Sequence, residues 1–219
     1  IDCIDGMADR IAELVSVMPA DICVMTGDYR MKCAGSLDHI FPRLKQVINA
    51  IRAPEGLLVT LGNHDSHQMI PLFDDLGVRV LVNETAELRR GDATIRLTGL
   101  DDVCFFYTDA ALQALATPPN DVFSVALVHS AEMAAEAAEN GYALYLCGHA
   151  HSGQVCLPGG RAIFTRLSRN RHLYKGFWKI DGMTGYSTSG VGVSGLPVRW
   201  FSRGEAALFT LRCGPLPAC

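Results

Sequence analysis

Polar side chains that can ligate a metal ion occur directly after four short apolar runs of the sequence. They are Asp28 after residues 22–26, Asn63, His64 and Asp65 after 57–61, His129 after 122–128, and His149 and His151 after 142–147. Carboxylate, amide and imidazole ligands together suit a divalent ion such as Mn, Fe or Zn. One such residue after a strand is usually an ordinary turn or loop residue. The same placement after four runs indicates a shared metal site.

The surrounding segments predict the scaffold that would position these side chains. The four apolar runs have the length and composition of buried strands, and glycine ends the first two. Helical spacing predicts helices at 7–18, 37–51, 69–76, 109–115 and 131–139, and further strands are predicted at 78–82, 84–89 and 93–98. This order predicts an α/β protein with a layered, mixed sheet, in which ligands collect at the carboxyl ends of the strands.

The pattern changes after residue 150. Helical spacing stops, glycine becomes frequent, and short strands, including 198–201, predict an antiparallel tail. Residues 190–195 match the GxGxxG pattern of dinucleotide-binding proteins, but Pro197 and a strand pattern follow instead of a helix. We therefore interpret this stretch as a glycine-rich loop.

Length and composition limit the class of protein. The chain has 219 residues, of which 49% are hydrophobic and 19% charged, so a disordered or fibrous protein is excluded. No apolar run reaches the roughly 20 residues of a membrane span, and residues 1–20 lack a signal-peptide pattern. The 8 cysteines form no CxxC pair, which favours a reducing compartment. We predict a cytoplasmic protein, or one peripheral to the inner face of the membrane.

The net charge of −4 hides an uneven distribution. Residues 161–219 carry 9 Lys/Arg and 2 Asp/Glu, a charge of +7, and residues 1–160 carry the remaining −11. The basic segment 161–203 also contains aromatic and aliphatic residues. It is either a solvated rim or a surface for an anionic partner, namely substrate phosphates or peripheral contact with an anionic membrane. Nucleic acid is not expected, because the acidic remainder would repel a long polyanion.

Four motifs resemble those of the calcineurin-like metallophosphoesterases. They are GDYR at 27–30, GNHD at 62–65, His129, and GHAH at 148–151. GHAHSGQV at 148–155, with SGVG at 189–192 and LPVR at 196–199, is similar to a bacterial branch with a GHTHGGQ-type motif. That branch contains phosphodiesterases and relatives that cleave the pyrophosphate of UDP-diacylglucosamine. The resemblance implies a single domain over residues 1–219, built as a two-sheet β sandwich flanked by helices.

The resemblance also implies a role for each motif residue. Asp28 would bridge two divalent ions, with Mn preferred over Fe or Zn, and Asn63, His129 and His149 would complete the ligands of one ion. His151 would bind the other. A metal-bridging hydroxide would then hydrolyse a phosphodiester or pyrophosphate bond of a phosphorylated small-molecule or lipid-linked substrate. His64 would contact the scissile phosphate and protonate the leaving oxygen, and Asp65 would orient His64 and raise its pKa.

The family's first motif, Asp-x-His on the strand before the first helix, does not occur in this sequence. Position 4 is Ile, and we expect Asp2 and Asp5 to belong to the lead-in and N-cap of the first helix. Two explanations stay open: the first strand lies upstream of Ile1, or the protein holds its second ion weakly. A non-catalytic, metal-binding interaction module on the same fold is the alternative to a dinuclear phosphohydrolase.

Other histidines and acids are secondary candidates. Asp101 and Asp102 follow a predicted strand and are interpreted as a solvated turn, with contact to the site as the alternative. His67 lies close to GNHD and is one further candidate for substrate contact. His39 and His172 are predicted to be surface residues.

Overall fold

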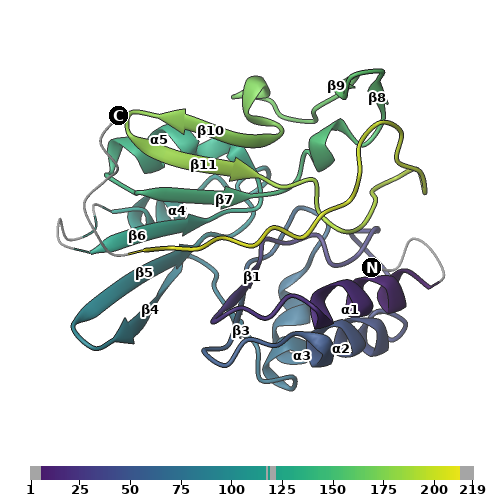
Figure 1. The fold of residues 1–219 in the computed structure, drawn as a ribbon, viewed down its shortest axis with the longest axis horizontal. Coiled ribbons are helices and arrows are strands. Elements are labelled where there is room, and N and C mark those ends of the chain that lie inside the picture. The colour runs from purple at the N-terminus through teal and green to yellow at the C-terminus, as the bar shows by residue number, and fades with distance from the viewer. Residues whose placement is uncertain (1–5, 117, 119–121, 213–219) are drawn as a thin grey trace.

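The computed structural model describes residues 6–116, 118 and 122–212 (Figure 1). The predicted lead-in with Asp2 and Asp5 lies outside these residues. None of the helices in the described part of the chain has the length and apolar character needed to cross a bilayer.

Two β-sheets form the centre of the molecule. The smaller sheet is parallel, with strand order β1-β2-β3, and its strands are β1 (Cys23–Met25), β2 (Leu57–Val59) and β3 (Arg79–Val80). The larger sheet is mixed, with order β10-β11-β7-β6-β5-β4. Its strands are β4 (Glu84–Arg90), β5 (Ala93–Gly99), β6 (Phe123–Leu127), β7 (Leu144–Cys147), β10 (Gly176–Ile180) and β11 (Met183–Ser187). A separate hairpin pairs β8 (Cys156–Leu157) with β9 (Arg161–Ala162).

Alternation along β6 shows how the layers pack. Val125 and Leu127 join Leu58 of β2 in a core between the two sheets. Ala126, on the opposite face of β6, packs in a second core with Ala137. Successive side chains of a strand point to opposite faces, so one strand serves both cores. The chain therefore forms the two-sheet sandwich flanked by helices that was predicted.

Helices cover the outer faces of both sheets (Figure 1). On the small sheet these are α2 (Phe41–Ala50), the 3₁₀ turn η1 (His67–Met69) and α3 (Ile70–Asp74), and α1 (Met7–Ser16) packs against α2. Leu44 of α2 and Phe73 of α3 pack there in one core with Val59. On the large sheet they are α4 (Asp109–Ala114), the turn η2 (Ala131–Met133) and α5 (Ala134–Glu139). Two further 3₁₀ turns are η3 (His151–Gly153) and η4 (Arg171–Leu173).

Two sequence-based predictions of element boundaries were wrong. The helix predicted from residue 37 begins at Phe41, because Pro42 favours the first turn of a helix over its interior. The predicted strand 198–201 does not form, and only Trp200 makes an isolated bridge, to Val155. Pro197 has no N–H for a ladder, and Phe201 has a φ of 49°, which ends extended backbone.

The tail is also not purely antiparallel. β10 and β11 form the expected antiparallel hairpin, but β11 pairs in parallel with β7, from Thr184 opposite Leu144 to Ser187 opposite Cys147. This pairing places the segment after β11 beside the segment after β7, since parallel strands end at the same edge of a sheet. Residues 190–195 form an irregular loop, as the sequence predicted.

Candidate metal centre

The loops that leave β1 and β2 lie against each other, and glycine makes this approach possible. Gly27 has a φ of 100°, a conformation that side chains disfavour. Gly62 is required for a different reason: a Cβ there would lie 2.5 Å from Asp28 Oδ1 and 2.7 Å from His129 Cε1. Both glycines thus bring Asp28 close to the residues that follow β2.

Asp65 ties these two loops together through its carboxylate. Its Oδ2 accepts hydrogen bonds from the backbone N–H of Asp28 at 2.7 Å and Gly62 at 2.8 Å, and its Oδ1 accepts one from Tyr29 at 2.9 Å. The predicted role of Asp65 in orienting His64 is corrected, because the carboxylate faces backbone amides instead. Burial and the neighbouring Asp28 charge raise the pKa of Asp65 to about 7.

His129 presents one ring nitrogen to the site. Its Nδ1 lies 2.7 Å from the carbonyl oxygen of Thr26, and a carbonyl only accepts, so Nδ1 carries the proton and donates. Nε2, the other ring nitrogen, lies 3.4 Å from Asp28 Oδ2 and 3.1 Å from Asn63 Oδ1. A backbone hydrogen bond at the far nitrogen is how metal-binding imidazoles are commonly oriented.

His149 completes the group. Its Nδ1 lies 2.9 Å from Asn63 Oδ1 and 3.2 Å from His129 Nε2, and its Nε2 lies 3.3 Å from the carbonyl oxygen of Arg166. One ligand atom each from Asp28, His129 and His149 lies within 4.8 Å of the others. Four predicted ligands, from the ends of four different strands, therefore converge on one point.

The electrostatics of this group suit a cation. Burial raises the pKa of Asp28, but the His129 imidazole and a hydrogen bond from the His64 N–H outweigh it, and the pKa is lowered. Burial lowers the pKa of His129, but the Asp28 carboxylate outweighs it and raises the pKa to about 9. Burial, followed by the nearby His129, lowers the pKa of His149 to about 4. His149 is therefore neutral near pH 7, the form that binds metals.

His151 lies next to the group but outside the set of converging atoms. Burial, followed by the Arg199 charge, lowers its pKa to about 4, and the Asp28 charge, which acts in the opposite direction, does not outweigh them. Its Nε2 is buried and has no hydrogen-bond partner among the described residues. A buried, neutral imidazole nitrogen without a partner fits a metal ligand, because leaving it unpaired would otherwise cost free energy.

His64 stands at the edge of the centre. Its backbone N–H donates to Asp28 Oδ1 at 3.0 Å, and its side chain is half-buried. The Nδ1 atom lies 3.8 Å from the thiol of Cys33, a neighbour that the sequence analysis did not anticipate. The loop that leaves β1 therefore contributes Cys33 as well as Asp28.

Arg199 is a second residue that the sequence analysis did not assign to the site. Its guanidinium donates to the carbonyl oxygens of Gly192 at 2.9 and 2.6 Å, Ser189 at 2.5 Å and His151 at 3.2 Å, and one of its nitrogens lies 3.3 Å from His151 Nδ1. It holds the glycine-rich loop against His151. The only signal for this role was the position of Arg199 in the LPVR motif.

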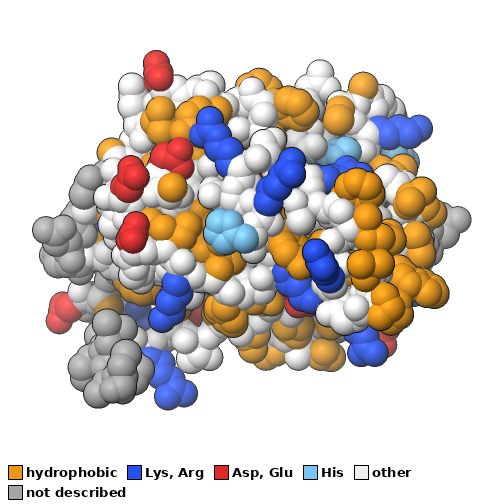
Figure 2. All heavy atoms as spheres, turned by 90° about the horizontal axis from the view of Figure 1, so that it is seen from above, with side chains coloured by type: hydrophobic (Ala, Val, Ile, Leu, Met, Phe, Trp, Pro, Cys, Tyr) orange, Lys and Arg blue, Asp and Glu red, His pale blue; other side chains and the backbone are white. Residues whose placement is uncertain are grey.

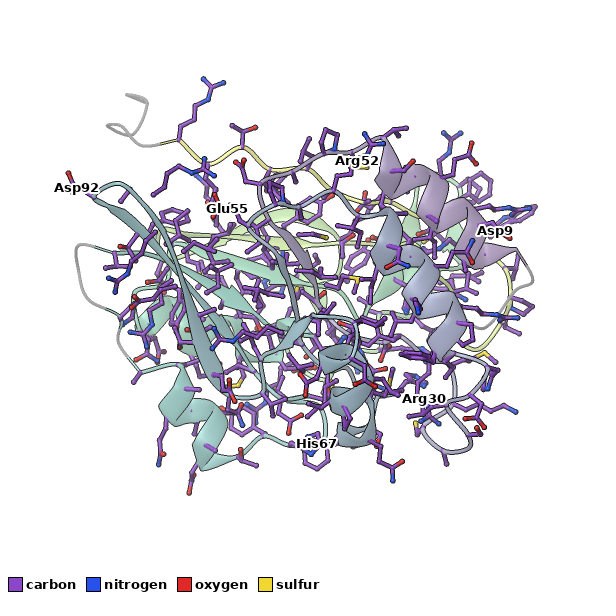
Figure 3. All side chains as sticks on the ribbon, turned by 90° about the horizontal axis from the view of Figure 1, so that it is seen from below. Asp9, Arg30, Arg52, Glu55, His67 and Asp92 are labelled. Carbon is purple, nitrogen blue, oxygen red and sulfur yellow. The ribbon has the colours of Figure 1, made fainter. Side chains whose placement is uncertain are left out.

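The secondary candidates have definite positions. His67, at the edge of the view in Figure 3, is exposed and lies 3.2 Å from the Asp101 carboxylate. Asp101 and Asp102 are buried, so their interpretation as a solvated turn was wrong. Asp102 instead caps its own turn, accepting from the N–H groups of Cys104 and Phe105. His39 and His172 are exposed, as predicted.

The backbone at the centre is strained. Asp28, His149 and His151 have φ values of 62°, 58° and 48°, in the left-handed region that favours glycine. Such residues persist only where the surrounding structure holds them, and they concentrate at functional sites. Their coincidence with the converging ligands supports a functional role for this edge of the sandwich.

Comparison with known proteins agrees with this geometry. No family model matches the chain. The chain is 28% identical over 200 residues to an uncharacterized metallophosphoesterase, YkuE of Bacillus subtilis (strain 168), covering 88% of this chain and 68% of that protein. This similarity supports the metallophosphoesterase family. It supports a general phosphohydrolase function that depends on divalent metals, and the Asp and His side chains of the centre offer a matching site.

Proposed function

We propose that this protein hydrolyses a phosphodiester or pyrophosphate bond with the help of two divalent ions, Mn being preferred. The observation that carries the proposal is the convergence of Asp28, Asn63, His129 and His149 at the ends of four strands. These residues would hold one ion, and Asp28 with His151 would contribute to the other. The chemistry that such ions supply when bound is charge for the phosphoryl oxygens and a lower pKa for water.

The chain's own residues would do three things around these ions. The Asp65 carboxylate and the paired glycines keep the Asp28 loop fixed, so the ligands need little reorganisation. The Thr26 carbonyl sets the tautomer of His129. His64, fixed through its backbone N–H but half-exposed at its ring, would donate a proton to the oxygen that leaves phosphorus.

The test is metal-dependent hydrolysis of bis(p-nitrophenyl) phosphate by the full-length protein. We expect release of p-nitrophenol with Mn, and little without added metal. His64→Ala should lower kcat by about 10²–10⁴-fold, the usual contribution of a general acid. The same variant should still bind Mn, since the ring of His64 is not in the converging set.

His39→Ala is the matched control, because His39 is exposed and precedes α2. It should retain wild-type activity. Full activity in His64→Ala would contradict the role of that residue. Tight Mn binding without hydrolysis of any phosphodiester or pyrophosphate probe would favour the non-catalytic module instead.

A further inference from the structure

A groove leads away from the proposed metal centre. It has a volume of about 820 Å³, and His151 is among its lining residues. Ile163, Phe164 and Leu196 form apolar parts of its lining, and Arg166 and Arg171 add positive charge. Apolar and cationic groups beside a phosphate-handling centre suit a molecule that has both a phosphate and an apolar part.

Six large apolar side chains are exposed at or near this groove, which is an unusually large cluster for the surface of a protein in water. The apolar rim consists of Ile163, Phe164, Leu196, Val198, Trp200 and Phe201. Phe164 is 77% exposed and Trp200 is 59% exposed. Figure 2 shows hydrophobic side chains gathered at the right of the face seen from above, with Lys and Arg side chains beside them. Single exposed apolar residues are common, but a contiguous patch marks a contact surface.

Hydrogen bonds hold the segments of the rim side by side. The N–H of Cys156 donates to the carbonyl oxygen of Trp200 at 2.8 Å, and the N–H of Trp200 donates to Gln154 at 2.9 Å. The β8–β9 hairpin then places Ile163 and Phe164 next to this pair. The rim is therefore one surface. It is formed by a segment that precedes the β10–β11 hairpin in the chain and a segment that follows it.

Positive charge predominates around the rim, although Glu205 lines the hollow beside it and accepts hydrogen bonds from Tyr186 and from the Ser189 N–H. Residues 155–203 contain 8 Lys/Arg and a single acidic residue, Asp181, in a protein whose first 160 residues carry −11. A smaller hollow of about 250 Å³ lies next to the rim, where Phe201, Lys175 and Arg203 are among its lining residues. An anionic partner is thus the electrostatic complement of this face.

We propose that the apolar rim docks on an anionic lipid surface, with Phe164 and Trp200 inserted at the interface and Lys175 and Arg203 facing lipid headgroups. Aromatic side chains with an apolar body favour that depth of a membrane, and each nearby cation adds attraction to anionic lipid. A lipid surface fits better than an acidic protein, because three residues of the rim itself, Ile163, Phe164 and Leu196, line the groove. A docked protein would block access to the groove. A lipid surface would instead bring phosphate-containing amphiphiles to it. Only this last point rests on the proposed function.

Vesicle sedimentation tests the proposal without any substrate. Wild-type protein should bind vesicles of phosphatidylcholine with phosphatidylglycerol and should not bind phosphatidylcholine alone. Phe164→Ser and Trp200→Ser should each weaken binding about tenfold, because burying a large apolar side chain contributes at least that much to a partition equilibrium. Lys175→Gln with Arg203→Gln should weaken it about fivefold for each charge removed.

Val17→Ser is the matched control, because Val17 is equally exposed but belongs to the end of α1, on the other sheet's side of the fold (Figure 1). It should bind vesicles as wild type does. Thermal melting shows which variants are folded, and a blue shift of tryptophan emission on vesicle binding tests the wild-type protein without any substitution.

Three outcomes would overturn the docking proposal: no binding to anionic vesicles, equal binding to both vesicle types, or unchanged binding by the folded Phe164 and Trp200 variants. No binding to either vesicle would leave an acidic protein as the partner of the rim. Vesicle binding by a protein that hydrolyses no phosphate probe would support the docking and refute the proposed function, so the two failures are distinguishable.

Discussion

Replacing Arg199 with lysine tests whether this guanidinium holds the glycine-rich loop onto the proposed metal centre. The guanidinium is half-buried and reaches four carbonyl oxygens through three nitrogens. Lysine keeps the positive charge, but its single ammonium cannot reach in several directions at once. Arg199→Lys therefore removes hydrogen-bond geometry and leaves the charge in place.

The magnitude follows from the contacts that lysine cannot reproduce. The shortest are those to Ser189 O at 2.5 Å and to Gly192 O at 2.6 and 2.9 Å. We count two as lost, because an ammonium can keep one and water can reach the rest of a half-buried site. At about 1.5 kcal/mol for each charged hydrogen bond, the lower end of the usual range, the loss of stability is about 3 kcal/mol. For a domain of this size that lowers Tm by about 6–12 °C.

Thermal melting followed by circular dichroism measures this loss. Arg10→Lys, at an exposed position of α1, is the control and should melt within about a degree of wild type. Even at temperatures well below its Tm, Arg199→Lys should be less active than wild type, because the backbone of His151 loses its support. If Arg199→Lys has the same Tm as the Arg10→Lys control and keeps wild-type activity, the proposal that Arg199 holds this loop in place is refuted.

Two further predictions concern the strand-end loops and the ion. Gly62→Ala should destabilise the protein by about 1–3 kcal/mol, because its Cβ would overlap Asp28 and His129, whereas Gly148→Ala meets only ordinary contacts and should melt like wild type. Equal melting of the two glycine variants would show that the loops do not pack as described. Mn at about 100 times its Kd should stabilise wild type by about 2.7 kcal/mol, reversibly with chelator, and should stabilise Asp28→Asn much less. An equal Mn-dependent rise in Tm for Asp28→Asn would place the ion elsewhere.

The convergence of four residues at the proposed centre could be predicted because their positions depend on local patterns. An apolar run followed by glycine and a polar residue reports both a buried strand and its end, so Asp28, Asn63, His129 and His149 could be placed at one edge. The structure brings these four together. The layered α/β class followed from the same runs and the helices between them.

Tertiary contacts between segments that are far apart in the chain could not be predicted from the sequence. The carboxylate of Asp65 is bound by amides from the other strand-end loop, and nothing in the letters GNHD distinguishes this from a contact with His64. Asp101 and Asp102 read as a polar turn, yet packing buries them. The parallel pairing of β11 with β7 joins segments far apart in the chain, which local periodicity does not report.

The hydrogen bond between Arg199 and the His151 carbonyl has a consequence for how the protein is made. The proposed ligands described here run along the chain from Asp28 to His151, and Arg199 follows His151 by 48 residues. Contacts between such distant segments form late and slowly during folding. Uptake of the proposed ions is therefore expected to follow the synthesis of Arg199, at a stage when the strands of both sheets have already been made and can pack.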